Sequence, residues 1–184
     1  NAQRFVIDAC RAADEDGVDF SEYDTDGNGK VDNVFVYYAG YNEAEGGAES
    51  SIWPHRSAIV STQEFDGVRL YDYACTSELK GSNGTTMCGI GTFCHEFGHV
   101  LGLPDFYCTD YSHKEPTLGQ WDAMDNGPYN NGGKTPPSYS SYERFFLGWL
   151  EPQILELGGM YELQPLVSSN TAYILANEKP NLDG

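Results

Sequence analysis

The feature that most constrains this 184-residue chain is the segment HEFGH, which places His95 and His99 four residues apart. Residues at this spacing lie one turn apart on one face of a helix, so both imidazoles can bind one metal ion. Glu96 projects beside that ion, where a carboxylate can take a proton from a metal-activated water. Two unrelated histidines are the less favoured interpretation, because the chain has only 4. We therefore predict a metal-binding helix over residues 86–101.

The residues after this helix supply a third ligand. Gly102 stands where the helix must end, because glycine adopts the left-handed conformation that other residues resist. Asp105 follows closely enough to return its carboxylate to the same ion. Three protein ligands, His95, His99 and Asp105, leave the fourth position of a tetrahedral zinc ion open for water, as in catalytic zinc sites. The alternative for Asp105 is an ordinary turn residue after Pro104.

This spacing resembles the motif of the metzincin metallopeptidases, HExxHxxGxxH, with Asp105 in place of the third histidine. The segment WDAMDNG at residues 121–127 resembles the methionine turn of that class. The resemblance implies that Met124 lies beneath the zinc as an apolar floor, whereas a lone methionine would be ordinary core. Metzincins often have a tyrosine two residues later; that position here is Asn126, and Tyr129, the nearest tyrosine, is assigned no role.

Three further segments are similar to the immune inhibitor A type of secreted bacterial metallopeptidase, the M6 family. They are residues 24–40, SIWPHR at 51–56 and LGWL at 147–150, so the resemblance covers roughly residues 20–150. It implies an α+β, metzincin-like fold with a twisted mixed sheet, a zinc-binding helix and a Met turn. We expect a catalytic domain over residues 1–150, and over 151–184 the start of a truncated C-terminal β segment.

These features predict a zinc-dependent endopeptidase, a hydrolase that cleaves extracellular proteins with metal-activated water and Glu96 as general base. The resemblance implies a bacterial protein that is secreted or located at the cell surface or in the periplasm. Two alternatives stay open: a catalytically inactive metal-binding adhesion module, and a zinc hydrolase of a non-peptide amide. The presence of Glu96 argues against the inactive module, which has no need of a base.

A second metal site is predicted in the acidic stretch that begins at residue 24. Side-chain oxygens recur at alternate positions, a glycine permits a sharp turn, and one backbone carbonyl is in place, which is the oxygen ligation that Ca²⁺ prefers. The stretch departs from an EF-hand because its twelfth position is Phe35 rather than glutamate. The alternative is an Asp/Gly turn without an ion. The predicted ligands of this structural calcium are Asp24, Asp26, Asn28, Lys30 (by its backbone carbonyl) and Asp32.

Hydrophobic periodicity predicts the remaining elements. We expect an amphipathic helix over residues 1–16 and a buried strand over 34–38 that stops at Ala39-Gly40. A second strand over 69–75 is expected at a sheet edge, where residues 70–75 would pair with an extended substrate. A helix over 138–147 should turn four aromatic residues to one face. Short strands are expected over 153–157, 160–166 and 172–176; the four aromatic residues are Tyr139, Tyr142, Phe145 and Phe146.

Charge and cysteine content narrow the partners. The net charge of −18 disfavours nucleic acid and anionic membranes, no apolar run reaches the ~20 residues of a membrane span, and a polypeptide substrate is expected. The oligomeric state and the pairing of the 5 cysteines stay open; Cys94 is interpreted as core or disulfide. His55 and His113 are interpreted as structural or exposed. The acidic residues Glu43, Glu45 and Glu49 are interpreted as a solvated face, which would favour basic substrate residues if it lined the cleft.

Overall fold

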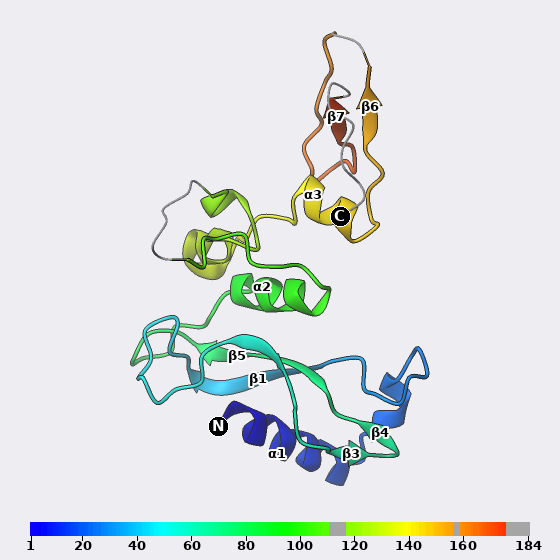
Figure 1. The fold of residues 1–184 in the computed structure, drawn as a ribbon. Coiled ribbons are helices and arrows are strands. Elements are labelled where there is room, and N and C mark those ends of the chain that lie inside the picture. Colours follow the sequence, from blue (N-terminus) through cyan, green and yellow to red (C-terminus); the bar gives the residue numbers. More distant parts are fainter. Residues whose placement is uncertain (111–116, 157–158, 176–184) are drawn as a thin grey trace.

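The computed structural model describes residues 1–110, 117–156 and 159–175. Figure 1 shows helix α1 on one face of a sheet, helix α2 on the other, and the C-terminal strands at the far end from α1. The elements are α1 (Ala2–Glu15), the 3₁₀ helix η1 (Phe20–Tyr23), β1 (Val34–Tyr41), β2 (His55–Ala58), β3 (Glu64–Phe65), β4 (Val68–Arg69), β5 (Asp72–Leu79), α2 (Gly91–Val100), η2 (Gly119–Trp121), η3 (Gly127–Gly133), α3 (Ser141–Phe146), β6 (Gln153–Leu155) and β7 (Tyr173–Leu175).

The main sheet is mixed, as expected for an α+β fold. Its strand order is β1-β5-β2, with β5 parallel to β1 and antiparallel to β2. The prediction that the second strand lies at an edge is wrong. β5 is central, and its residues from Asp72 to Ser77 are buried because strands flank it on both sides and helices cover both faces. The edges are β1 and the short strand β2.

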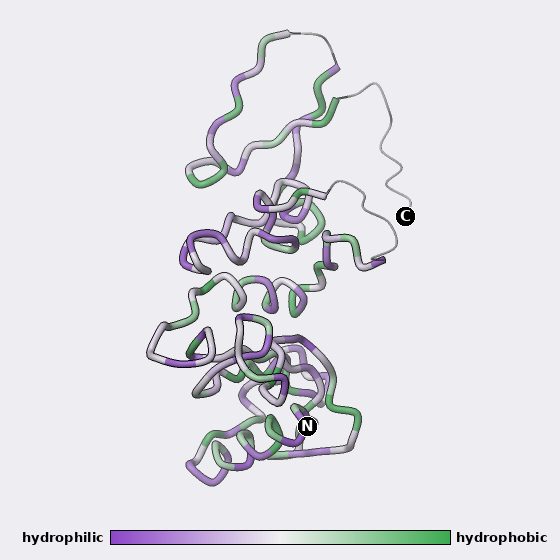
Figure 2. The backbone as a smooth tube through the Cα atoms, turned by 90° about the vertical axis from the view of Figure 1, so that its left-hand side faces the viewer, coloured by the Kyte–Doolittle hydropathy of each residue, from purple (hydrophilic) through white to green (hydrophobic). Residues whose placement is uncertain are grey.

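Helix α1 confirms the amphipathic N-terminal helix. Asn1 caps it, since its side chain accepts a hydrogen bond from the Gln3 amide. Its apolar side packs on the sheet through Val6 and Cys10, and Figure 2 shows hydrophilic and hydrophobic residues mixed along its length. The core that results contains Val6, Ile7, Cys10, Phe20, Val31, Tyr38, Ile59, Val68, Leu70, Tyr73 and Cys75.

Strand β1 is longer than predicted. It does not stop at Ala39-Gly40 but continues to Tyr41, with a shift of register against β5 between Tyr38 and Tyr41. Gly40 has a φ of +94°, a conformation that a side chain would resist. The irregularity therefore lets the strand bend and resume pairing at Leu79 rather than end.

Helix α2 begins five residues later than predicted, at Gly91. The preceding residues extend the sheet instead: Met87 bridges Leu79, and the Cys88 amide donates to the Glu78 carbonyl. Gly91 lies against Pro128, whose carbonyl oxygen would be 1.8 Å from an added Cβ. The helix thus starts where its backbone packs against Pro128 of η3.

The C-terminal elements depart further from prediction. Helix α3 covers only residues 141–146 of the predicted 138–147, and its buried side is not aromatic, because Tyr142 and Phe146 are 63% and 58% exposed while Glu143 is buried. Strands β6 and β7, which pair in parallel, confirm two of the three predicted short strands. The predicted last residues of these two strands, 157 and 176, lie outside the described residues. Residues 160–166 form no strand.

Within the described residues, Cys10, Cys75, Cys88 and Cys94 form no disulfide, and Cys94 is half-buried. Among the described residues, no helix is both long and apolar enough to cross a membrane.

Candidate active site

Helix α2 turns its phenylalanines towards β1 and leaves its histidines on another face. The ring of Phe93 lies 4.6 Å from that of Phe35, measured between centroids, and Phe97 stacks on Phe93. His95 and His99 then lie one turn apart, with ring centroids 4.8 Å apart and planes at 82°. The spacing of four residues therefore brings both imidazoles to the same side of the helix.

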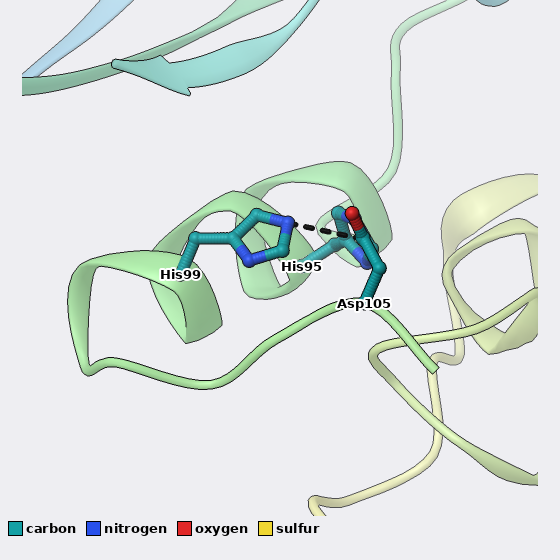
Figure 3. A group of neighbouring side chains, drawn as sticks. All are labelled: His95, His99 and Asp105. Atoms are coloured by element: carbon teal, nitrogen blue, oxygen red, sulfur yellow. Dashed lines mark ion pairs between the residues drawn. The ribbon is translucent and has the colours of Figure 1, made fainter. Parts of the chain in front are cut away.

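The chain reverses at the end of α2 and returns Asp105 to these rings. Gly102 has a φ of +101°, and the Leu103 amide donates to the Gly98 carbonyl at 2.9 Å, which closes the helix. One oxygen of Asp105, Oδ1, then lies 3.2 Å from Nε2 of His95 and 3.2 Å from Nε2 of His99. Figure 3 shows the carboxylate between the two imidazoles.

The main chain fixes which nitrogen of each imidazole carries the proton. Nδ1 of His95 lies 2.9 Å from the Ala123 carbonyl oxygen, and Nδ1 of His99 lies 2.8 Å from that of Leu103. A carbonyl oxygen can only accept a hydrogen bond, so each Nδ1 must donate. Burial also lowers the pKa of His95, because it disfavours the imidazolium. In the neutral ring, the lone pair therefore sits on Nε2 and points towards Asp105.

Three acceptor atoms thus converge on one point. The two Nε2 atoms and an oxygen of Asp105 all lie within 4.8 Å of one another. Asp105 Oδ1 is buried, and no hydrogen-bond donor among the described residues reaches it. Neutral imidazoles and a carboxylate are ligands that zinc takes. Because three electron-pair donors facing one another repel unless a cation or proton lies between them, the donor set fits a zinc ion.

Glu96 is buried beside this cluster, with 6% of its surface exposed. Burial, and then the negative charge of Asp105, raises the pKa of the Glu96 carboxyl group to about 7, although a hydrogen bond from the Arg56 backbone opposes the shift. A carboxyl group with this pKa can both accept and release a proton near neutrality.

Met124 packs underneath the helix. It is fully buried, and a Cβ added to Gly98 would come within 2.3 Å of its sulfur, so the helix and the methionine are in close contact. The amide of Met124 donates to Asp122 Oδ1 at 2.7 Å, and its carbonyl accepts from the Phe106 amide at 2.9 Å. One hydrogen bond therefore lies within the turn that contains Met124, and the other connects this turn to the segment that follows helix α2.

A cavity of about 710 Å³ opens over the cluster. Its wall includes Asn126 and Tyr129, the two residues near the methionine to which no role was assigned. Strand β2 forms another part of the wall, which the sequence analysis did not anticipate because a four-residue strand gives little periodic signal. The lining residues are Ala44, Trp53, Pro54, His55, Arg56, Thr92, His95, Glu96, His99, Asp105, Tyr107, Cys108, Thr117, Asp125, Asn126, Pro128 and Tyr129.

Two other expectations concern this wall. His55 is hydrogen-bonded through Nε2 to the Tyr73 hydroxyl at 2.8 Å and through Nδ1 to the Trp53 carbonyl at 2.6 Å, which favours a structural role. His113 lies outside the described residues. Glu45 is half-buried rather than part of a fully solvated face, and its Oε2 accepts hydrogen bonds from Asn42 and Thr92.

The predicted calcium ligands lie in an exposed loop beside β4. Carboxylate oxygens of Asp24, Asp26 and Asp32 lie within 4.8 Å of one another. These oxygens already accept hydrogen bonds from the loop: Asp24 from the Asn28 and Gly29 amides, and Asp32 from the Thr25 hydroxyl. The side-chain amide nitrogen of Asn28 donates to Asp26. The backbone of Lys30 forms an isolated parallel β-bridge with that of Arg69 in β4.

Comparison with known proteins supports one family. Residues 6–153 match the model of the immune inhibitor A peptidase M6 catalytic domain. The chain is 32% identical over 170 residues to "Immune inhibitor A" of Bacillus thuringiensis subsp. alesti, a match that covers 77% of this chain and 24% of that protein. It is 27% identical over 197 aligned positions to "Pre-pro-metalloprotease PrtV" of Vibrio cholerae serotype O1 (strain M66-2), covering 92% of this chain and 20% of that protein. This chain therefore spans a quarter or less of the relatives, and it belongs to the immune inhibitor A (M6) family of zinc metallopeptidases.

Proposed function

We propose that residues 1–150 form the catalytic domain of a secreted or cell-surface bacterial endopeptidase that hydrolyses peptide bonds of extracellular proteins. The observation that carries this proposal is the convergence of two Nε2 lone pairs and an Asp105 oxygen on one point, beside a buried carboxyl group and beneath an open cavity. A structural zinc site would instead be closed by a fourth protein ligand.

In this proposal His95, His99 and Asp105 hold the zinc ion. When bound, zinc would act as a Lewis acid that polarises the scissile carbonyl and lowers the pKa of water. The carbonyl oxygens of Ala123 and Leu103 keep the two imidazoles in the tautomer and orientation that binding requires. The side chains therefore hold the binding geometry before the metal arrives.

Glu96 is the proposed general base. Its carboxylate accepts a proton from the attacking water and then donates it to the nitrogen of the leaving amine, so that one group serves as base and acid in turn. The raised pKa of Glu96 suits both steps, since a carboxyl group of ordinary acidity would hold the proton too weakly to return it. The Arg56 amide, by hydrogen bonding to the carboxylate, helps to keep it aimed into the cavity.

An extended substrate would lie along β2 rather than along residues 70–75. The central position of β5 leaves it no free edge, whereas β2, within the described part of the chain, pairs on one side through residues 55–58 and lines the cavity. Addition of a substrate strand to an exposed edge supplies main-chain hydrogen bonds without regard to side chains. The aromatic residues Trp53, Tyr107 and Tyr129 in the wall would contact substrate side chains.

Three further roles belong to this proposal. Met124 is proposed as the floor of a metzincin-type Met turn, which its contact with Gly98 supports. Residues 151–184 are proposed to begin a C-terminal β segment, which the β6–β7 pair supports. The 24–32 loop is proposed as a structural calcium site; the proximity of Asp24, Asp26 and Asp32 supports it, and without a cation their mutual repulsion would oppose this arrangement.

The deciding experiment is digestion of casein by the purified chain, loaded with zinc or stripped with a chelator. We expect cleavage of internal peptide bonds that chelation abolishes and zinc restores. Glu96→Gln provides the control for a contaminating protease, because it should bind zinc without cleaving. Zinc binding at one ion per chain without cleavage of casein or of a peptide library would contradict the proposal in favour of a recognition module or a hydrolase of another amide.

A further inference from the structure

The Met124 turn contains a buried carboxyl group, that of Asp122, which the proposed chemistry does not use. Asp122 is fully buried, and its Oδ1 accepts a hydrogen bond from the Met124 amide at 2.7 Å. Its second oxygen, Oδ2, is also buried, and no N–H or O–H group of the described residues donates to it. Half of this carboxyl group is therefore satisfied by the backbone and half is not.

Glu143 of helix α3 is in the same situation. It is fully buried, and its Oε2 accepts the Ser140 amide as part of the capping box that starts the helix. Its second oxygen, Oε1, is buried and receives no donor within the described part of the chain. Asp122 and Glu143 thus each present one unsatisfied oxygen, although they are 21 positions apart in the sequence.

The two unsatisfied side chains lie within hydrogen-bonding reach of each other. Two ionised carboxylates can only accept, so they would repel, whereas one shared proton turns the contact into a hydrogen bond. Burial is the largest cause that raises the pKa of both groups. The charged groups that also face Asp122 are Asp125, which raises its pKa further, and His95, which lowers it.

This contact bears on the metal ligands through the backbone. Asp122 precedes Ala123, whose carbonyl oxygen accepts the hydrogen bond from Nδ1 of His95. We propose that Asp122 and Glu143 share one proton, and that this carboxyl–carboxylate pair holds the Met124 turn against α3 and so positions the His95 imidazole. The second half of this inference rests on the proposed function, because it concerns a zinc ligand; the first half does not.

Amide substitutions test the shared proton by geometry. One oxygen of each side chain, Oδ1 of Asp122 and Oε2 of Glu143, accepts a backbone N–H. An amide at either position must therefore keep its oxygen there and turn its NH₂ group towards the partner. In Asp122→Asn or Glu143→Gln alone, that NH₂ group donates to the remaining carboxylate and replaces the shared proton. In the double variant the two NH₂ groups face each other, with no acceptor between them.

Thermal unfolding and zinc titration at pH 7 supply the readouts. We expect each single variant to melt within about 2 °C of the unmodified protein, and the double variant to melt about 4–10 °C lower, as two buried donors lose their acceptors. The double variant should also bind zinc about 10–100-fold more weakly, because His95 loses its fixed acceptor. The exposed single variant Glu151→Gln removes one negative charge, as the double variant does because the proton-sharing pair carries only one, and it should alter neither property.

The pH dependence of stability is a second measurement that needs no double variant. A raised pKa means that the folded protein keeps a proton which the unfolded chain releases near the ordinary carboxyl values of 3.8 and 4.5. Above those values, stability of the unmodified protein should fall by up to tenfold in the folding equilibrium constant per pH unit, until the folded pair ionises. Each single amide variant should lose the part of the decline that this pair contributes, whereas the part that Glu96 contributes should remain.

Three outcomes would overturn parts of the inference. A double variant as stable as the singles would show that the two oxygens do not face each other. Singles as unstable as the double would show that both negative charges are required. A destabilised double variant with unchanged zinc affinity would reduce the pair to a structural contact. None of these comparisons depends on peptidase activity, so they can be made whether or not the protein cleaves peptides.

Discussion

The molecule carries two clusters of potential metal ligands that differ in how far they are organised before any ion binds. At His95, His99 and Asp105, no donor from the described residues competes for Asp105 Oδ1, and main-chain carbonyls hold the rings in place. In the 24–32 loop, Asp32 is exposed and Asp24 is half-buried, and both carboxylates are already hydrogen-bonded to the loop itself. Ligand spacing in the sequence is equally suggestive in both, so the difference lies in burial and in what else the ligand atoms can bind.

The sharpest test of the first cluster separates the base from the ligands. Glu96→Gln keeps the size of the side chain but cannot take a proton, so turnover should fall by at least the ~10²–10⁴-fold typical of lost acid–base catalysis. Zinc should stay bound at one ion per chain, measured by metal analysis beside the peptidase rate. Loss of zinc from this variant would make Glu96 a ligand and reverse its assignment.

Removing the third ligand should affect binding first. Asp105→Ala leaves two imidazoles, an incomplete tetrahedral site, so zinc affinity should fall by more than the roughly 10–100-fold typical when only an orienting partner is lost. Asp105→His should restore part of it, since imidazole fills this position in the commoner form of the motif. Competitive zinc titration measures both variants. Full affinity in Asp105→Ala would leave Asp105 as a turn residue.

An organised cluster should also destabilise the protein when it is empty. The folded pKa of Glu96, about 7, lies above its ordinary value of 4.5, so the folded state holds a proton that the unfolded chain has released. Stability of the metal-free protein should therefore fall as the pH rises from 4.5 towards 7, by about 2–3 kcal/mol at most. Denaturant unfolding should find Glu96→Gln more stable than the unmodified protein at pH 8 and equal to it near pH 4.5. Equal pH dependence of the two proteins would argue against a buried, perturbed Glu96.

The exposed loop should respond in the opposite way, gaining from an ion and losing little without it. Calcium at a hundredfold excess over its dissociation constant would stabilise the fold by about 2.7 kcal/mol, measured as a rise in melting temperature. Asp26→Ala should abolish that rise, whereas Glu15→Ala, an exposed acidic residue in α1, should keep it. An unchanged calcium response in Asp26→Ala would leave the loop as an Asp/Gly turn.

The sequence predicts that His95, His99 and Asp105 come together, as they do, because the grouping depends on local spacing. Two histidines one helical turn apart and a glycine that ends the helix set the cluster over eleven residues, 95–105, and no distant element is needed to bring the ligands together. The N-terminal helix was predictable for a similar reason, since its apolar spacing and its cap at Asn1 lie within one segment.

The features that sequence missed depend on partners far along the chain. The alternation in residues 70–75 predicts an edge strand, yet β5 is central because β1 and β2 pair with it on its two sides. Helix α3 turns a glutamate inward instead of its aromatic residues, because Glu143 finds Asp122 and the Ser140 amide there. A buried carboxyl group is stable only with such partners, and no local pattern announces them.

The acceptors that orient His95 and His99 are carbonyl oxygens of the backbone, and this has a consequence for how the site can change over time. Every amino acid brings the same carbonyl group, so replacement of the side chains at positions 123 and 103 does not delete the acceptors. What is inherited is the path of the chain. Amino-acid substitution at these two positions is therefore restricted by the backbone conformation rather than by the identity of the side chain. The third ligand can alternate between carboxylate and imidazole while His95 and His99 keep their orientation.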